Sequence, residues 1–285
     1  MTAATRDGRH GLLGVLVPLV YDLYFSAILS GVAEAAYERR LQILLSPTQH
    51  EHAREVSLFD RVHRVTDGAL IVLPEESSAE LELALGAGYP FVVVDPLVAL
   101  DRRIPCVAAD HEAGAAQAMR HLLELGHRRI AAITGPPGWL ATEGRLRAYY
   151  AALAAAGIPP DPGLLVTSDF EFAPGFAAAA TLLGVPDPPT AVFAFNDAIA
   201  VGAMRAAHAA GLRVPQDVSI VGFDDIKYAA MVTPALTTVR QPLAELGQTG
   251  ISLALRLLDD EPLETVQLEL PTRLVVRDTT APPRR

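Results

Sequence analysis

The sequence predicts an α/β protein with two doubly wound parallel-sheet lobes and a ligand cleft between them. Short apolar runs alternate with longer helical patterns from end to end, as in βαβ units. The apolar runs are continuous, which is typical of strands covered on both faces of a parallel sheet. The strand–helix series runs twice within 285 residues, a length beyond the roughly 100–150 residues of one common domain.

The expected strands are the apolar runs that stand between turn residues. The first series comprises residues 12–17, 41–45, 69–73, 91–94 and 107–109, and the second 129–134, 164–167, 191–194, 219–222 and 237–239. Two further strands, 266–270 and 274–276, are expected near the end of the chain.

Helices are expected between these strands, and several carry end signals. They include residues 25–39, 112–125, 142–156, 198–210 and 243–258. Gly126, Gly157 and Gly211 stand where a left-handed C-terminal cap needs no Cβ. Asp110 and Asn196 stand where a side chain caps a helix N-terminus.

The two series define the expected domains. We expect an N-terminal lobe of residues 12–126 and 241–261, and a C-terminal lobe of residues 127–240 and 262–280. Residues 1–11 are expected to be a flexible stub and residues 281–285 a flexible tail.

The charge balance argues against nucleic-acid binding through the surface of this chain. The net charge is −10 at pH 7, and the densest basic cluster is only His127-Arg128-Arg129. Proteins that bind the phosphate backbone of nucleic acids usually carry a basic patch or stripe on their surface. The chain as given is therefore expected to be a poor DNA binder.

Neither membrane insertion nor export is expected. No apolar run approaches the roughly 18 residues that span a bilayer. The run 11–21 is broken by Pro18 and closed by Asp22, and no cleavage site follows it. We expect a cytoplasmic protein, in which the lone Cys106 is a small buried hydrophobe.

Common catalytic motifs are absent from the sequence. No GxGxxG follows a strand, and neither a GxxxxGK[ST] loop nor a GxSxG elbow occurs. His111-Glu112 does not continue into HExxH, and His50-Glu51-His52 is interpreted as a solvated loop or helix start. An enzyme with Asp224 or Asp225 as general base is the least favoured hypothesis. We expect no catalytic residue, metal or cofactor.

Polar and aromatic residues gather at the carboxyl ends of the expected strands, where open α/β sheets bind ligands. They are Asp22, Arg145, Phe170, Asn196, Asp224 and Gln241. Carboxylate, amide and guanidinium groups bind vicinal sugar hydroxyls, and aromatic rings stack on the apolar face of a sugar. Each such residue alone also has a structural interpretation: Asp225 as a helix cap, Arg145 as a solvated charge and Phe170 as part of the core.

Six segments together resemble one family. They are HLLELGHRRIAAITGPP (121–137), GRLRAYYAAL (144–153), FNDAIAVGAMRA (195–206), DVSIVGFDD (217–225), PALTTVRQP (234–242) and LPTRLVVRDTTAPP (270–283). In this order they resemble the regulatory core of lactose-repressor-type (LacI/GalR) transcription factors, a fold similar to periplasmic sugar-binding proteins. The resemblance covers residues 12 to about 282.

The resemblance implies roles for individual residues. Effector contacts fall on Arg145, Asn196 and Asp224, with Phe170 as the stacking aromatic. Gln241 falls at a position that reaches the ligand in some members.

The chain departs from the family pattern in two places. Where the family often has Asn-Pro-Phe-Phe, this chain has Asp22-Leu23-Tyr24-Phe25, which keeps Phe25 in the site. Asp22 adds a carboxylate acceptor that favours a polyhydroxylated effector over an anionic one. The N-terminal helix-turn-helix and hinge of the family are not found in the sequence, so the chain is either a fragment or a naturally headless member.

The function implied by the resemblance is an effector-binding and dimerisation core. A sugar-like effector would favour one lobe orientation and so change the DNA affinity of the intact homodimer. Operator DNA would be bound only through an N-terminal domain absent from this chain. Ile28, Val32 and Ala36 are candidates for the dimer surface, or for the core. The alternative is a solute-binding protein that delivers a sugar to a transporter.

The first testable prediction concerns DNA. We expect no tight, sequence-dependent gel shift with the chain as given at physiological salt, because it is acidic and lacks a basic patch. Fusion of a helix-turn-helix and hinge to its N-terminus is expected to confer binding. A tight specific shift by the unfused chain would contradict the prediction.

Overall fold

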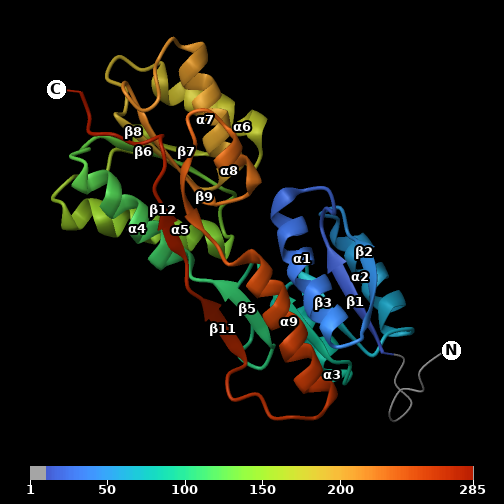
Figure 1. Ribbon diagram of the computed structural model, residues 1–285. Coiled ribbons are helices and arrows are strands. Elements are labelled where there is room, and N and C mark those ends of the chain that lie inside the picture. Colours follow the sequence, from blue (N-terminus) through green and yellow to red (C-terminus); the bar gives the residue numbers. More distant parts are fainter. Residues whose placement is uncertain (1–10, 285) are drawn as a thin grey trace. The chain divides into compact units, whose positions relative to one another are not determined.

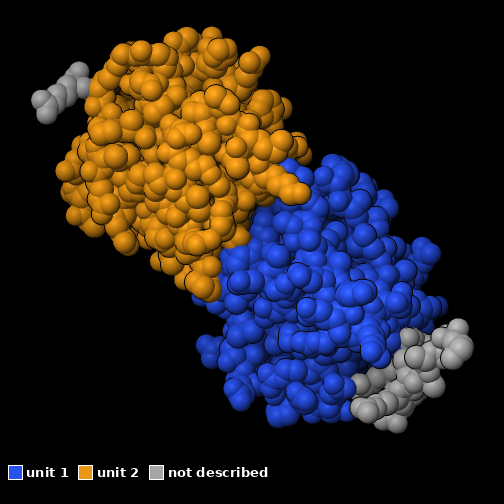
Figure 2. Space-filling model, viewed as in Figure 1, with its two compact units in different colours: residues 1–109, 242–270 blue, residues 110–241, 271–285 orange. Residues whose placement is uncertain are grey.

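The computed structural model describes residues 11–284, which form two compact units. Within the described residues, unit 1 comprises residues 11–109 and 242–270, and unit 2 comprises residues 110–241 and 271–284 (Figure 2). Apart from Gly11, the expected N-terminal stub lies outside the described residues, as does Arg285.

Unit 1 is a doubly wound sheet with the strand order β11-β5-β4-β3-β1-β2, all parallel (Figure 1). The order reverses between β1 and β3, as at the switch point of flavodoxin-like folds. Its elements are β1 (Leu12–Val17), α1 (Leu23–Glu38), β2 (Gln42–Pro47), α2 (His52–His63), β3 (Gly68–Val72), α3 (Ser78–Gly86), β4 (Phe91–Val94), β5 (Cys106–Ala109), α9 (Leu243–Leu258) and β11 (Gln267–Leu270).

Unit 2 repeats this plan with the order β12-β10-β9-β8-β6-β7, in which only the edge strand β12 is antiparallel. Its elements are α4 (His111–Glu124), β6 (Ile130–Thr134), α5 (Leu140–Ala155), the 3₁₀ turn η2 (Pro162–Leu164), β7 (Leu165–Thr167), α6 (Phe172–Leu183), β8 (Ala191–Ala194), α7 (Asp197–Ala209), β9 (Ser219–Asp224), α8 (Lys227–Met231), β10 (Thr237–Arg240) and β12 (Arg273–Val275).

The cores lie on both faces of the sheets. In unit 2, α6 and α7 cover one face and α4 and α5 the other, each with its own apolar cluster (Figure 1). Every residue of β3, β4, β6 and β8 is buried. Because helices cover both faces of each sheet, the strand sequences are continuous apolar runs. Within residues 11–284, no helix is long and apolar enough to cross a membrane.

The fold class and the predicted elements are confirmed, with ends that move by no more than two residues. Gly126, Gly157 and Gly211 have φ of +97°, +67° and +74°, the left-handed conformation expected of them. Asp110 and Asn196 cap α4 and α7. Helices α2, α3, α6 and α8 were not named from the sequence.

The lobe boundaries differ from the expected ones at two places. Helix α4 lies in unit 2, because Ala115, Met119 and Leu122 belong to the core formed with α5 and the second sheet. Strand β11 lies in unit 1, because it pairs with β5. The boundaries expected after residues 126 and 261 therefore fall after residues 109 and 270.

The final segment of the chain is anchored rather than loose up to residue 284. The Ala281 carbonyl accepts hydrogen bonds from the buried His127 ring (2.9 Å) and from Ser219 (3.0 Å). Arg284 forms an ion pair with Asp217 at 2.6 Å. A flexible tail from residue 281 is thus not what the structure shows.

Two expectations about apolar residues have different outcomes. Cys106 is buried as predicted, and burial raises the pKa of its thiol to about 11. Ile28, Val32 and Ala36 are core residues rather than a dimer surface, with exposures of 0%, 0% and 1%. They lie on the face of α1 that packs against α9.

The second prediction concerns the approach of α1 to α9. A Cβ on Gly31 would lie 1.9 Å from the Ala244 carbonyl oxygen, a backbone atom that cannot yield without moving α9. We expect Gly31→Ala to lower the free energy of unfolding by roughly 1–3 kcal/mol through overpacking. Urea denaturation measures the change.

Gly86→Ala is the matched control for Gly31→Ala, since nothing lies within 4 Å of its Cβ position at the end of α3. It is expected to leave stability unchanged or to raise it by up to about 1 kcal/mol through helix propensity. Equal effects of the two substitutions would contradict the close packing of α1 on α9.

Candidate functional site

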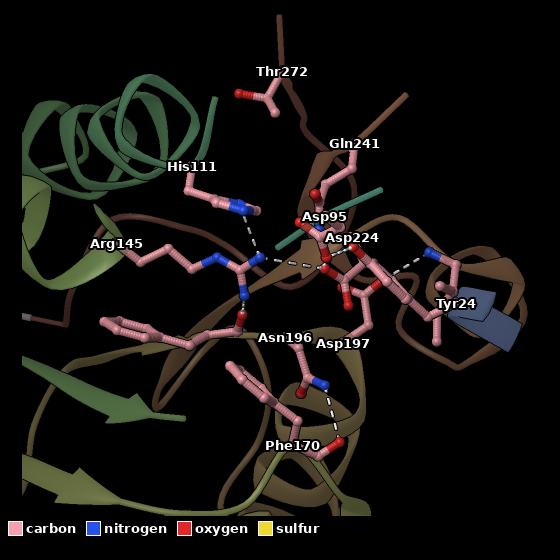
Figure 3. A network of polar contacts seen from close by, with 12 residues as sticks. Tyr24, Asp95, His111, Arg145, Phe170, Asn196, Asp197, Asp224, Gln241 and Thr272 are labelled. Atoms are coloured by element: carbon pink, nitrogen blue, oxygen red, sulfur yellow. Dashed lines mark hydrogen bonds and ion pairs between the residues drawn. The ribbon is translucent and has the colours of Figure 1, made fainter. Parts of the chain in front are cut away.

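The carboxyl edge of the unit 2 sheet brings four of the predicted site residues together (Figure 3). Asp224 ends β9, Gln241 follows β10, Asn196 precedes α7, and Arg145 lies in α5. Parallel strands deliver their carboxyl ends to one edge, which is where doubly wound sheets bind ligands. The placement at this edge agrees with the sequence prediction, and a ligand role for each residue stays a prediction.

Asp224 is the centre of this group. Its carboxyl is buried, accepts a hydrogen bond of 2.6 Å from Gln241 Nε2 and lies 3.8 Å from Arg145 Nη2 (Figure 3). Its backbone has φ of +115°, a region that non-glycine residues rarely adopt. Such strain costs about 1–3 kcal/mol and clusters at functional sites.

Arg145 is not a solvated charge, since only 3% of it is exposed. The guanidinium lies over the Phe223 ring, 3.8 Å from the ring centroid, and donates to the Phe195 carbonyl. Its Nη2 also lies 3.3 Å from His111 Nδ1 (Figure 3). Cation–π stacking and a carboxylate neighbour together stabilise a charge that burial alone would disfavour.

Phe170 and Asn196 are joined by a hydrogen bond. Asn196 Nδ2 donates to the Phe170 carbonyl (3.0 Å), while its Oδ1 accepts from Ile199 as the cap of α7. The Phe170 ring packs against Trp139 at 5.5 Å between centroids and occupies the space in front of Gly135. The two half-buried rings form an aromatic surface beside the polar group.

Gln241 completes the polar group with a buried acceptor. The residue is 4% exposed, and its Oε1 has no hydrogen-bond partner within the described part of the chain. A buried acceptor without a donor costs free energy. A ligand hydroxyl is a suitable donor for this atom.

Two neighbouring aspartates have structural partners instead. Asp225 forms ion pairs with Arg240 (2.5 Å) and Arg277 (2.6 Å), so it is not the helix cap considered from the sequence. Asp197 is fully buried and accepts from Thr238 and from the Ile226 backbone. Burial, followed by the charge of Asp224, holds the pKa of Asp197 well above its usual value.

Asp22 and Phe25 lie in unit 1, after β1. Asp22 Oδ1 accepts from the Tyr24 backbone (2.7 Å) and caps α1, a role that was not predicted from the sequence. Phe25 is buried and packs edge-on against Tyr24, 5.4 Å between centroids. Their ligand role stays a prediction.

Several residues of these groups were missed from the sequence. His111 follows β5, at a strand end like the chosen residues, but was considered only as part of a failed HExxH. Trp139 and Phe223 are aromatic partners that only the fold brings to Phe170 and Arg145. Tyr24 donates to Asp95 after β4 (2.5 Å), a pair 71 positions apart that no local pattern indicates.

The two surface histidines after β2 have acidic partners. His50 pairs with Glu75 at 3.0 Å and His52, the first residue of α2, with Glu80 at 2.9 Å. No cluster of three metal-ligating side chains suited to an ion occurs between residues 11 and 284.

Comparison with known proteins matches this architecture. The family model described as "Periplasmic binding protein-like domain" matches residues 119–280. The HTH-type transcriptional repressor CytR of Escherichia coli K12 is 33% identical over 270 residues, covering 93% of this chain and 78% of the repressor. The ribose operon repressor of the same strain is 34% identical over 268 residues, covering 93% and 81%.

A solved structure agrees with these relatives. A LacI-family transcriptional regulator from Enterococcus faecium with bound ribose is 31% identical, with a TM-score of 0.84. The match covers 96% of this chain and all of that one.

The fold and the polar carboxyl edge therefore define a periplasmic-binding-protein-like regulatory core. The chain belongs to the LacI family of transcriptional regulators.

Proposed function

We propose that this chain is the sensor of a transcriptional regulator and binds a sugar or a related polyhydroxylated molecule at the carboxyl edge of the unit 2 sheet. The observation that carries the proposal is the buried carboxyl of Asp224, held by Gln241 on a strained backbone at φ +115°. A fold keeps such strain where the resulting geometry is used.

The chemistry of the edge suits a neutral, hydroxylated ligand. Asp224 and Gln241 Oε1 accept hydrogen bonds, Arg145 and Asn196 donate them, and Phe170 with Trp139 offers an apolar surface. The ribose bound by the Enterococcus faecium regulator and the names of the ribose operon repressors support a sugar. Asp22 and Phe25 are proposed as additional contacts, with Asp22 favouring hydroxyl groups over anions.

The proposed output is regulation of DNA binding. An effector that binds one conformation of the core more tightly than another shifts the population toward it, by no more than the difference in affinity. In an intact regulator this shift changes operator affinity. We propose a cytoplasmic homodimer without a cofactor or a catalytic step.

The alternative, a solute-binding protein of a transporter, shares the fold. The relatives at 33% and 34% identity are named as repressors, which does not favour transport. Fold similarity alone would not separate the two functions.

The direct test is a thermal-shift screen against monosaccharides, with ribose included. A ligand at about 100 times its Kd stabilises the native state by about 2.7 kcal/mol through mass action. One sugar that raises Tm in a saturable way supports the proposal. The absence of any shift across sugars, sugar phosphates and nucleosides would contradict it.

The third prediction compares two adjacent carboxyls. Asp224→Asn keeps the size of the side chain, an acceptor for Gln241 and tolerance of positive φ, and removes only the charge. We expect the affinity for the selected sugar to fall about 10- to 150-fold, the value of one charge-assisted hydrogen bond. Calorimetry measures the affinity.

Asp225→Asn is the matched control for Asp224→Asn. It weakens the ion pairs with Arg240 and Arg277, so we expect lower stability with affinity nearly unchanged. If Asp224→Asn leaves the affinity unchanged, Asp224 is only a structural residue and the site is misplaced.

The fourth prediction is a homodimer. Light scattering at micromolar concentration is expected to give about twice the 30.3 kDa of one chain. The prediction follows from membership of the LacI family, whose regulatory core is expected to dimerise. A mass near that of one chain would argue for the solute-binding alternative.

A further inference from the structure

Two buried carboxyl groups meet in unit 1, outside the site described above. Glu55 lies on α2 with no exposed surface, and Glu76 lies between β3 and α3 with 6% exposed. The two side chains are in hydrogen-bonding contact. The Oε2 atoms of both are buried and lack any donor among the described residues.

A proton is the donor that this pair requires. Two carboxylates in contact and out of water cannot both be ionised without a large penalty. Glu55 Oε1 accepts a hydrogen bond of 2.6 Å from the Glu75 backbone, which leaves the proton to the remaining oxygens of the pair. We place it on Glu76, the carboxyl whose pKa is raised. Burial and the neighbouring Glu55 raise the pKa of Glu76 to about 9.

The charged groups around the pair connect the same two segments. His50, before α2, pairs with Glu75, and His52 on α2 pairs with Glu80 on α3. Glu80 also closes the capping box with Ser77. These contacts are exposed or half-buried and therefore contribute little each. The buried pair is the contact that can hold the loop firmly.

We propose that Glu55 and Glu76 share one proton that fastens residues 73–77 to α2, and that loss of this proton releases the loop. We call this pair the proton latch. The loop leaves the carboxyl end of β3 through Leu73, at φ +52°, so the latch fixes part of the carboxyl edge of the unit 1 sheet. The inference does not depend on which effector binds.

The sign of the pH dependence follows from proton linkage. When the loop is open, Glu76 regains the ordinary glutamate pKa of 4.5, whereas its pKa is about 9 when the loop is closed. Between these values the closed loop holds one more proton than the open loop. The opening equilibrium constant therefore rises about tenfold per pH unit in this window and levels off above it.

The test is hydrogen exchange of the Glu75 amide, whose partner is Glu55 itself. Base-catalysed exchange of an open amide rises about tenfold per pH unit, so the wild-type rate is expected to rise about a hundredfold per unit between roughly pH 6 and 8. Glu76→Gln supplies a neutral donor in place of the proton. Its amide is expected to show only the tenfold rise, with the loop still protected.

Two controls make the test specific. Glu51→Gln, an exposed change one turn before Glu55, is expected to keep the hundredfold rise. The Glu75 amide must exchange faster than the amides of β3, which marks opening of the loop rather than of the unit. A tenfold rise in the wild type, equal to that of Glu76→Gln, would overturn the proposal.

A second measurement holds even if Glu76→Gln fails to fold. The carboxyl carbon shift of Glu76 in the wild-type chain is expected to titrate near pH 9. Titration of Glu76 at an ordinary acidic value would overturn the proposal.

Discussion

Each sheet of this protein is covered by helices on both faces, and this constraint decides where its chemistry can lie. With β3, β4, β6 and β8 wholly buried, polar side chains cannot be placed along these strands. They are confined to the points where strands end. Parallel pairing delivers those ends to one edge, so residues far apart in the chain become neighbours there. Asp224 and Arg145 meet in this way across 79 positions.

Each unit buries carboxyl groups, and the two units compensate for the buried charge in different ways. In unit 2 the carboxyl of Asp224 has a guanidinium and an amide as neighbours, and the guanidinium has the Phe223 ring. In unit 1 two carboxyls face each other, so a proton must take the place of the cation. In the first arrangement the compensating cation is an arginine, which stays charged. In the second arrangement the compensating group is a proton, so that arrangement depends on pH.

The sequence predicts the fold well because the fold depends on local and periodic features. Continuous apolar runs locate the strands, and Gly126, Gly157 and Gly211 end helices by their own conformational freedom. Features that depend on contacts between residues far apart in the sequence could not be predicted in this way. The hydrophobic pattern of α4 does not indicate which of the two sheets the helix covers. The apolar residues Ile28 and Val32 would have the same sequence pattern whether they packed against α9 or against another chain.

The candidate site shows the same limit. Strand ends are visible in the sequence, so Asp224, Asn196 and Gln241 could be found. The stacking of Arg145 on Phe223, the pairing of Tyr24 with Asp95 and the contact of Glu55 with Glu76 depend on pairs 21 to 78 positions apart. The type of each of these residues does not indicate which residue it contacts. Position at a strand end was a better guide for His111 than the catalytic motif against which it was judged.

The strained backbone at Asp224 is maintained by interactions other than those proposed to bind a ligand. Asp225, with φ of +57°, is fixed by Arg240 on β10 and by Arg277 on the segment after β12. The Gln241 backbone donates to the Asp224 carbonyl at 3.2 Å, and Arg277 also donates to Leu236. A residue in an unfavourable conformation persists only when its surroundings over-determine it. Because several contacts hold this turn, weakening one of them, such as an ion pair of Asp225, is expected to lower stability before it alters the geometry of the site.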